Sequence, residues 1–272
     1  MTVLYEMLSY HFMIRAIVVG GLVALCASLL GVTLVLKHYS MIGDGLSHVG
    51  FGALSAAMVM NAAPFAVAVP VVILAAFLLL RISEKGKLKG DAAIGLISSS
   101  AIALGVAITS LSSGMNADVY SYMFGSVLSM SREDVVLSVI LAAIVLLVFV
   151  LCYHTIFAVT FDESFARANG TKTGRYNILL AVLTAITIVV GMRIMGTMLI
   201  SGLIIFPALS SMRLFQNFKS VMISAAIISV VCFLIGIVIS YLLAVPTGAS
   251  IVLANLAVFL LAALAGRLLG AG

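Results

Sequence analysis

The stretch VVLSVILAAIVLLVFVLC, residues 135–152, contains no charged side chain and a single hydroxyl group. Such a run is long enough to cross a bilayer as a helix, which takes about 17–25 apolar residues. Comparable runs recur along the chain, near 16–36, 42–60, 64–81, 92–112, 134–152, 176–192, 195–213, 220–243 and 249–267. The pattern predicts an all-α polytopic membrane protein, a bundle of about eight to nine transmembrane helices.

The composition agrees with this prediction. The chain has 272 residues, of which 64% are hydrophobic and 8% are charged, whereas a soluble domain carries about a quarter charged residues. A fold with so few charges cannot cover itself with a water-compatible surface, so we expect many apolar side chains to face membrane lipid. The net charge is +5, but no basic run lies beside aromatic residues, and we therefore expect no nucleic-acid partner.

The distribution of basic residues predicts the orientation, because Lys and Arg concentrate in cytoplasmic loops. Eleven of the 14 Lys and Arg fall in alternate loops and at the C-terminal tail, and the opposite set holds Arg15, Arg132 and Arg193. The loops with Lys85 and Arg167, and the C-terminus, are predicted to be cytoplasmic. The N-terminus is then predicted to lie outside.

No stretch between the spans is long enough to fold as a soluble domain. We therefore expect residues 1–272 to form one transmembrane domain. Residues 1–15 contain Glu6 and His11 and have no small-residue cleavage site, so they are expected to form an interfacial segment rather than a cleaved leader. The longest cytoplasmic segment is predicted at 153–175.

The second predicted span opens with GDGLSHVGFG, residues 43–52. Asp44 and His48 are four residues apart, so a helix places both side chains on one face, and the glycines let other helices approach closely. A carboxylate with an imidazole is a partial ligand set for Mn²⁺, Fe²⁺ or Zn²⁺. The alternative is that Asp44 is an N-cap and His48 a packed, hydrogen-bonded histidine, and the residues alone leave both interpretations open.

A second polar segment, FDESFARANG, covers residues 161–170 between two long spans. Asp162, Glu163 and Ser164 are helix start signals, and Gly170 is a stop signal. A short cytoplasmic helix of this kind could dock into a groove on a partner protein. A surface loop with no function is the alternative.

Four further segments complete a pattern: DAAIG (91–95), FGSVLSMSRED (124–134), GTMLISGLIIFPALSS (196–211) and PTGASIVL (246–253). In this order, together with the two polar segments, they resemble the zinc, manganese and iron permease family of bacterial ABC importers, with the greatest likeness to the zinc-uptake type. The resemblance implies a homodimer of permease subunits in the bacterial cell membrane. Its implied partners are two cytoplasmic ATPase subunits and an extracytoplasmic metal-binding protein.

The same resemblance implies roles for individual residues. Asp44 and His48 would contact the transported metal, zinc or manganese, with no other bound cofactor. The coupling contact with the ATPase would be made by the segment from residue 161 to residue 170, with Phe161, Asp162, Glu163, Ala166 and Gly170 as its predicted residues.

Three other classes of protein fit less well. One of them differs in its energy source. The chain has no GxxxxGK[ST] phosphate loop, so energy must come from a partner or from an ion gradient. A transporter driven by an ion gradient would show repeats and several intramembrane acids, and neither is evident. A catalytic zinc takes three protein ligands, which argues against an enzyme. A permease for a cobalamin- or siderophore-type cargo remains a further alternative.

Overall fold

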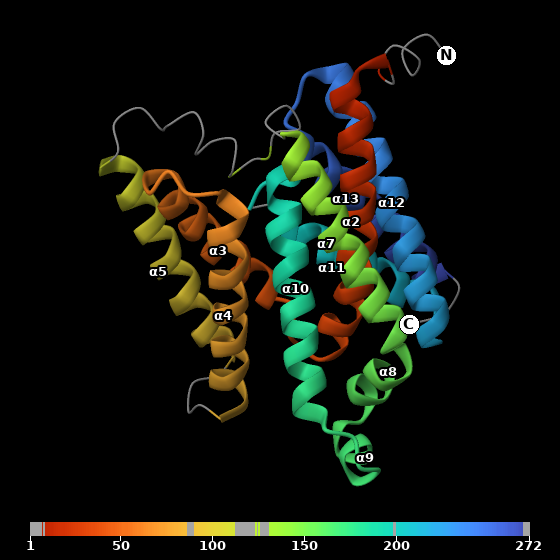
Figure 1. Cartoon of the computed structure of the whole chain (residues 1–272). Coiled ribbons are helices and arrows are strands. Elements are labelled where there is room, and N and C mark those ends of the chain that lie inside the picture. Colours follow the sequence, from red (N-terminus) through yellow and green to blue (C-terminus); the bar gives the residue numbers. More distant parts are fainter. Residues whose placement is uncertain are drawn as a thin grey trace.

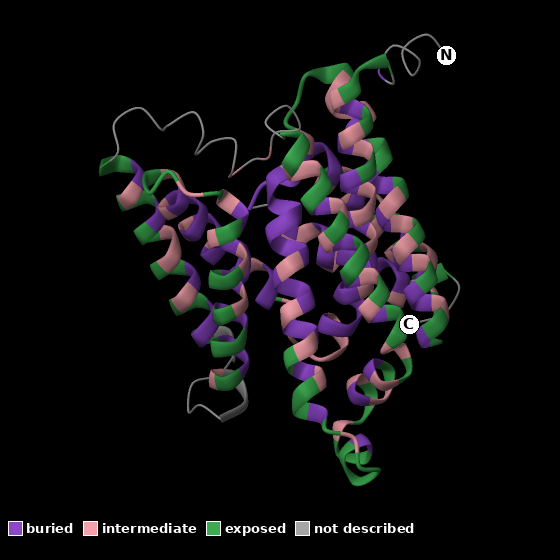
Figure 2. Cartoon of the chain, viewed as in Figure 1, coloured by how far each residue is buried: buried purple, intermediate pink, exposed green. Residues whose placement is uncertain are grey.

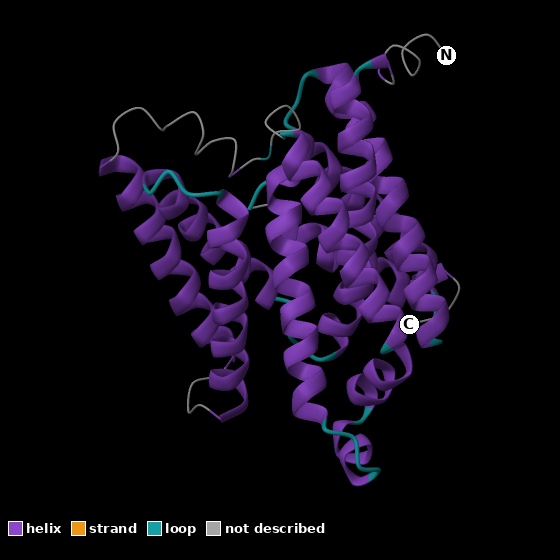
Figure 3. Ribbon diagram, viewed as in Figure 1, coloured by secondary structure: helices purple, strands orange, loops and turns teal. Residues whose placement is uncertain are grey.

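The described part of the chain is helical throughout (Figure 3). The computed structural model describes residues 7, 9–85, 90–111, 123, 125, 131–197 and 200–268. Within them the helices are α2 (His11–Leu36), α3 (Ile42–Val59), α4 (Pro64–Lys85), α5 (Gly90–Leu111), α7 (Arg132–Leu151), α8 (Tyr153–Phe161), α9 (Glu163–Ala168), α10 (Thr173–Met195), α11 (Ile200–Leu214), α12 (Phe218–Leu243) and α13 (Thr247–Leu268) (Figure 1).

Seven of the described helices are long and apolar enough to cross a membrane, namely α2, α4, α5, α7, α10, α12 and α13. Each coincides with a predicted span. The remaining two predicted spans, 42–60 and 195–213, correspond to α3 and α11. Helix α3 has 18 residues and is less apolar, since it carries Asp44 and His48, and α11 has only 15 residues. The chain is thus a multi-pass membrane protein with seven such helices in its described part.

The first span starts earlier than predicted. Helix α2 begins at His11, so the end of the predicted interfacial segment 1–15 belongs to the span. Residues 1–6 and 8 lie outside the described part of the chain, as does most of the motif at 124–134. Helix α10 ends at Met195, and Gly196, which follows it as the C-cap, has a φ of 85°.

Helices α2 and α10 form the interior of the bundle. In each of them, 67% of the most apolar 18-residue stretch is buried, whereas in the other five spanning helices the buried share is 22% to 39%. Figure 2 shows the buried residues gathered along these two helices, whereas exposed residues lie on the outer helices and on α9. Helix α2 packs against α7, α10, α11 and α12, and α10 packs against α3 and α4.

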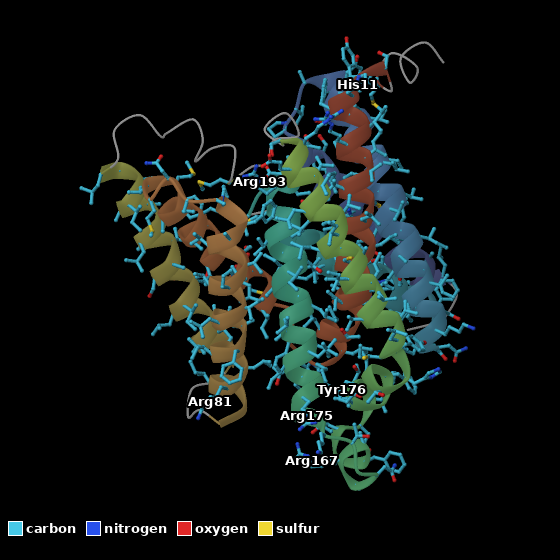
Figure 4. The ribbon with its side chains drawn as sticks, in the orientation of Figure 1. His11, Arg81, Arg167, Arg175, Tyr176 and Arg193 are labelled. Atoms are coloured by element: carbon cyan, nitrogen blue, oxygen red, sulfur yellow. The ribbon has the colours of Figure 1, made fainter. Side chains whose placement is uncertain are left out.

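Charged residues mark the two ends of the bundle. Figure 4 shows His11 and Arg193 at one end and Arg81, Arg167 and Arg175 at the other. The charge pattern separates Arg193 from the other three arginines in the same way. The predicted alternation of loops therefore agrees with the helix directions.

The charge count placed Arg193 in a loop, but the structure places it in a helix. It lies in the last turn of α10 and is 6% exposed. Its Nη2 donates to Oδ2 of Asp134 at 2.5 Å, and its guanidinium lies 5.7 Å from the ring centroid of Phe65. A charge at a buried helix end is stable only when it is paired, and this pair joins α10 to the first turn of α7.

Glycine lets α2 and α11 touch through their backbones. A Cβ atom added at Gly31 would collide with the backbone oxygen of Ile204 on α11. Because lipid tails are as apolar as the helices, close packing of this kind is a main source of helix association in a bilayer. Gly21, on the same helix, has nothing within 4 Å of its added Cβ.

We expect Gly31→Ala to destabilise the protein by about 1–3 kcal/mol, because α2 and α11 must separate to admit the methyl group. Gly21→Ala is the matched control and is expected to be neutral or stabilising, since alanine favours a helix by about 0.5–1 kcal/mol. Thermal unfolding in detergent, followed by a thiol-reactive dye that reports exposure of the buried Cys26 and Cys232, measures both. Equal unfolding temperatures for the two variants would contradict the close contact.

Candidate functional site

Asp44 lies inside the first turn of α3 and does not cap it. The helix begins at Ile42, Met41 occupies the N-cap position, and no side chain caps the helix. The N-cap explanation for Asp44, which the sequence left open, is therefore wrong. The carboxylate is instead directed at other side chains.

Those side chains are His48 on α3 and Ser201 on α11. Nε2 of His48 lies 3.5 Å from Oδ2 of Asp44, which confirms that the two residues share one helix face. The Ser201 hydroxyl donates to Oδ1 of Asp44, also at 3.5 Å. The neighbouring Ser47 takes no part, because its hydroxyl donates to the backbone oxygen of Asp44 at 2.7 Å. Three polar side chains from two helices thus converge at one place.

The sequence did not identify Ser201 as a site residue. It lies 157 positions from Asp44 and sits in an apolar segment where a serine is common in membrane helices. Only the crossing of α11 over the first turn of α3 brings the two together. No spacing rule within one helix could have predicted the contact.

The glycines of the segment explain how α3 reaches so many neighbours. A Cβ at Gly45 would lie 2.8 Å from Cγ2 of Ile94, and one at Gly52 would lie 2.9 Å from the backbone oxygen of Ala101, both on α5. At Gly50 an added Cβ would meet the side chain of Met192 on α10. Close packing on two sides therefore fixes the position of Asp44 and His48, as the sequence predicted from the glycine content.

The carboxylate remains accessible in the single chain. The Asp44 side chain is 34% exposed, whereas that of His48 is 12% exposed. Among the described residues no group of three or more His, Cys, Asp or Glu could hold a metal ion. One chain therefore offers one carboxylate, one imidazole and one hydroxyl. These three groups could contact a cation, but they are too few for a structural or catalytic zinc site, which uses three or four protein ligands.

The second polar segment also folds as predicted from its start and stop signals. Asp162 is the N-cap of α9, and its Oδ1 accepts from the backbone N–H of Phe165 at 2.8 Å. The helix ends before Gly170, which has a φ of 82°, a conformation that glycine adopts without strain. Figure 1 shows α9 as the outermost part of the bundle at its end.

Glu163 attaches this short helix to two membrane helices. Its Oε2 lies 3.5 Å from Nζ of Lys37, at the end of α2, and accepts from Nδ2 of Asn177 on α10 at 3.3 Å. Lys37 also donates to Oδ1 of Asn177. Within α9 itself, Nη2 of Arg167 lies 3.0 Å from Oε1 of Glu163.

The charge of Glu163 is stabilised by this network. Burial raises the pKa of its carboxyl, but the hydrogen bond from Asn177 and the charge of Lys37 outweigh that effect, so the pKa lies below its ordinary value. A lowered carboxyl pKa contributes stability that is fully present above the ordinary value. The attachment of α9 is therefore complete at neutral pH, and it weakens only as the pH falls through the lowered pKa.

The outward face of α9 differs from the one the sequence suggested. Ala166 is 2% exposed and packs within the chain, whereas Phe165 is 64% exposed and Phe161 is 58% exposed. Large apolar side chains exposed in a polar segment are typical of interaction sites. Phe165 is thus a candidate contact residue that the sequence reasoning missed, because a six-residue helix has too few turns to reveal which face is buried.

Helices of spanning length, with a polar pair set among them, define a multi-pass membrane protein. Residues 9–266 match the model of the ABC 3 transport family, and the chain belongs to that family. The resemblance noted from the sequence motifs is thereby confirmed. Since members of the family are membrane permeases, the chain is a transport subunit and not an enzyme.

Individual relatives extend over nearly the whole chain. The manganese transport system membrane protein MntB of Synechocystis sp. is 32% identical over 95% of this chain and 84% of its own length. The manganese import system permease protein ScaB of Streptococcus gordonii is 27% identical over 92% and 90%. A chain of PsaBC from Streptococcus pneumoniae, solved in complex with a Fab, has a TM-score of 0.87 at 27% identity and covers 96% of this chain and 94% of that one.

Proposed function

We propose that this chain is the membrane-spanning permease subunit of an ATP-driven ABC importer that moves a divalent transition metal ion into the cytoplasm. The convergence of Asp44, His48 and Ser201 inside the bundle carries the proposal. Membership of an ABC transport family supports ATPase and substrate-binding partners, and it counts against an ion-coupled secondary transporter. The metal is the cargo of this site.

The site lies deep in the membrane in this proposal. Arg213 is exposed in the last turn of α11, and a charged side chain at a helix end belongs outside the hydrocarbon. Ser201 is then about 18 Å from that boundary along the helix, more than half-way through a hydrocarbon core of about 30 Å. Helices α3 and α11 are therefore proposed to lie in the membrane beside the seven spanning helices, within a single domain covering residues 1–272.

Manganese is the favoured cargo. The relatives MntB and ScaB are both named for manganese, and neither is named for zinc. A carboxylate, an imidazole and open positions suit Mn²⁺, which accepts oxygen-rich sites. The overall likeness of the sequence favoured zinc, and the same ligands would also accept that ion.

A second copy of the chain would complete the site. One chain brings Asp44 and His48 together, and among the described residues no third His, Cys, Asp or Glu joins them. The Asp44 carboxylate is also partly exposed in the single chain. A homodimer with both pairs facing a common pathway would offer two carboxylates and two imidazoles. Binding would still be weaker than in a closed site, because the ligands come from two separate subunits. Weak binding allows the ion to be released, which transport requires.

The charge pattern further leads us to propose a cytoplasmic location for the end that carries α9 and for the C-terminus. We expect an impermeant maleimide to label neither Ser83→Cys nor Gly272→Cys in intact cells, and to label both after lysis. His11→Cys is the outside control, in a background where Cys152, which is partly exposed, is replaced by serine. Labelling of both positions in intact cells would reverse the orientation.

The metal assignment is tested by Asp44→Asn. Asparagine keeps the shape and the oxygen that faces Ser201 but removes the charge. We expect metal uptake to fall by at least about tenfold, while the amount of folded protein stays the same. The measurement is uptake of radioactive or fluorescence-detected Mn²⁺ into cells or proteoliposomes that contain the complete transporter.

Ser47→Ala is the matched control, because the Ser47 hydroxyl donates only to the backbone of its own helix, and it should transport normally. His48→Ala should fail as Asp44→Asn does. The double variant should be little worse than either, since groups that act as a unit are not additive. Normal uptake by well-folded Asp44→Asn would remove Asp44 from the ligand set.

Helix α9 is proposed as the coupling contact with the ATPase. We expect Phe165→Ala to weaken association with the ATPase subunit by at least about tenfold, because a few residues, often aromatic, carry most of the binding free energy of a protein interface. Ser164→Ala, at an exposed position of the same helix, is the control. Co-purification and ATP hydrolysis of the complex measure both.

Ala166→Arg separates this role from a structural one. Because Ala166 is buried within the chain, the variant should lower the stability of the permease itself, with the loss of association following from that. A Phe165→Ala complex that assembles and hydrolyses ATP normally would show that α9 does not make the contact.

A further inference from the structure

A groove of about 510 Å³ runs along the outside of the bundle, and no residue of α3 or α9 is among its described lining residues. Its walls come from α7 and α8 on one side and from α12 on the other, and Leu29 of α2 contributes to its lining. Figure 1 shows the lower part of α7 passing beside α12. The volume falls within the range of about 300–1,000 Å³ that is typical of small-molecule sites.

The groove is polar at one end only. Lys219 is the second residue of α12, and Tyr153 and His154 are the first two residues of α8. All three line the groove, at the end of α7 and the beginning of α12, which is the end of the bundle that carries α9. The rest of the lining is apolar and includes Phe149 and Ala226. No carboxylate is present among the described residues that line the groove.

The charge at this end favours an anion. Lys219 is exposed, and a lysine ammonium group offers three hydrogen-bond donors and no acceptor. Helix α12 is 26 residues long and begins at Phe218, so the positive end of its backbone dipole adds to the charge of Lys219. His154 and Tyr153 can supply further hydrogen bonds to an anionic oxygen.

We propose that this groove binds an anionic glycerophospholipid from the leaflet on the α9 side. One acyl chain lies between α7 and α12, over Leu29, and the phosphate meets Lys219 and His154. A water-soluble anion would leave the apolar part of the groove uncovered. The two helices that flank it span the membrane, so a lipid supplies both the chain and the charge. Basic pockets at the cytoplasmic ends of membrane helices recognise lipid headgroups in this way.

The bound lipid would connect α8 to α12. The ring centroid of Tyr153 lies 5.8 Å from that of Phe218, the first residue of α12, and those of Phe157 and Phe161 lie 5.0 Å and 5.6 Å from it. A phosphate that contacts both Lys219 and the start of α8 would hold α8 and α12 together in addition to these aromatic contacts. We therefore expect lipid binding to slow amide hydrogen exchange in residues 153–161.

The experiment compares phosphatidylglycerol with phosphatidylcholine, added to the purified full-length chain in detergent, with bound lipid counted by native mass spectrometry. The wild type should bind phosphatidylglycerol about fivefold more tightly, as expected for one lysine at an anionic headgroup. Lys219→Gln should lose this preference, and Lys219→Arg should keep it. Arg81→Gln removes an exposed charge at the same end of the bundle, outside the groove, and should also keep it.

Ala226→Phe fills the groove and should reduce binding of both lipids. Equal binding of the two lipids by the wild type, or an unchanged preference in Lys219→Gln, would overturn the proposal. So would an Ala226→Phe variant that changes the oligomeric state and leaves lipid binding intact, because the groove would then be an interface with a second copy. The Lys219 variants alter an exposed side chain, so the test holds even if the filled groove prevents folding.

Discussion

Direct backbone contact at glycine holds the centre of the bundle together. Gly31 brings α2 against Ile204 of α11, and Gly52 brings α3 against Ala101 of α5. In a bilayer the hydrophobic effect does not draw helices to one another, so association depends on close van der Waals packing at small residues. The geometry of the polar site follows from these contacts, because Asp44 belongs to α3 and Ser201 to α11. Any added methyl group at the crossings moves one side of the site relative to the other.

The apolar surroundings of the bundle also explain why the two charges named below are paired. A lone charge in hydrocarbon is costly, and both the guanidinium of Arg193 and the ammonium of Lys37 have a carboxylate partner on another element. These pairs lie near opposite ends of the bundle and fasten α7 to α10 and α9 to α2. The Asp44 carboxylate differs, since its partners are the imidazole of His48 and the hydroxyl of Ser201. Among the described residues no lysine or arginine forms an ion pair with it.

The sequence predicts the elements of this structure better than their contacts. Hydrophobic length locates the seven spanning helices, the i,i+4 spacing places Asp44 beside His48, and capping signals delimit α9. Contacts between distant segments are not encoded in any local period. Ser201 could not be assigned to Asp44, and Arg193 was taken for a loop residue because its partner Asp134 lies 59 positions earlier. The burial of Ala166 depends on the neighbouring helices, so residue type alone gave no sign of it.

Two structural routes lead from α9 to the polar site. Glu163 contacts Lys37, which caps the end of α2, and α3 begins only a few residues later. It also contacts Asn177 of α10, and the same helix carries Met192, whose side chain fills the space over Gly50 of α3. Packed helices move as rigid units with few alternative arrangements. These contacts connect α9 with the start of α3 through Lys37 and with the middle of α3 through α10. A shift of α3 would change the position of Asp44 relative to Ser201, which lies on a different helix. The coupling contact that we propose for α9 is in this way connected to the polar site without touching it.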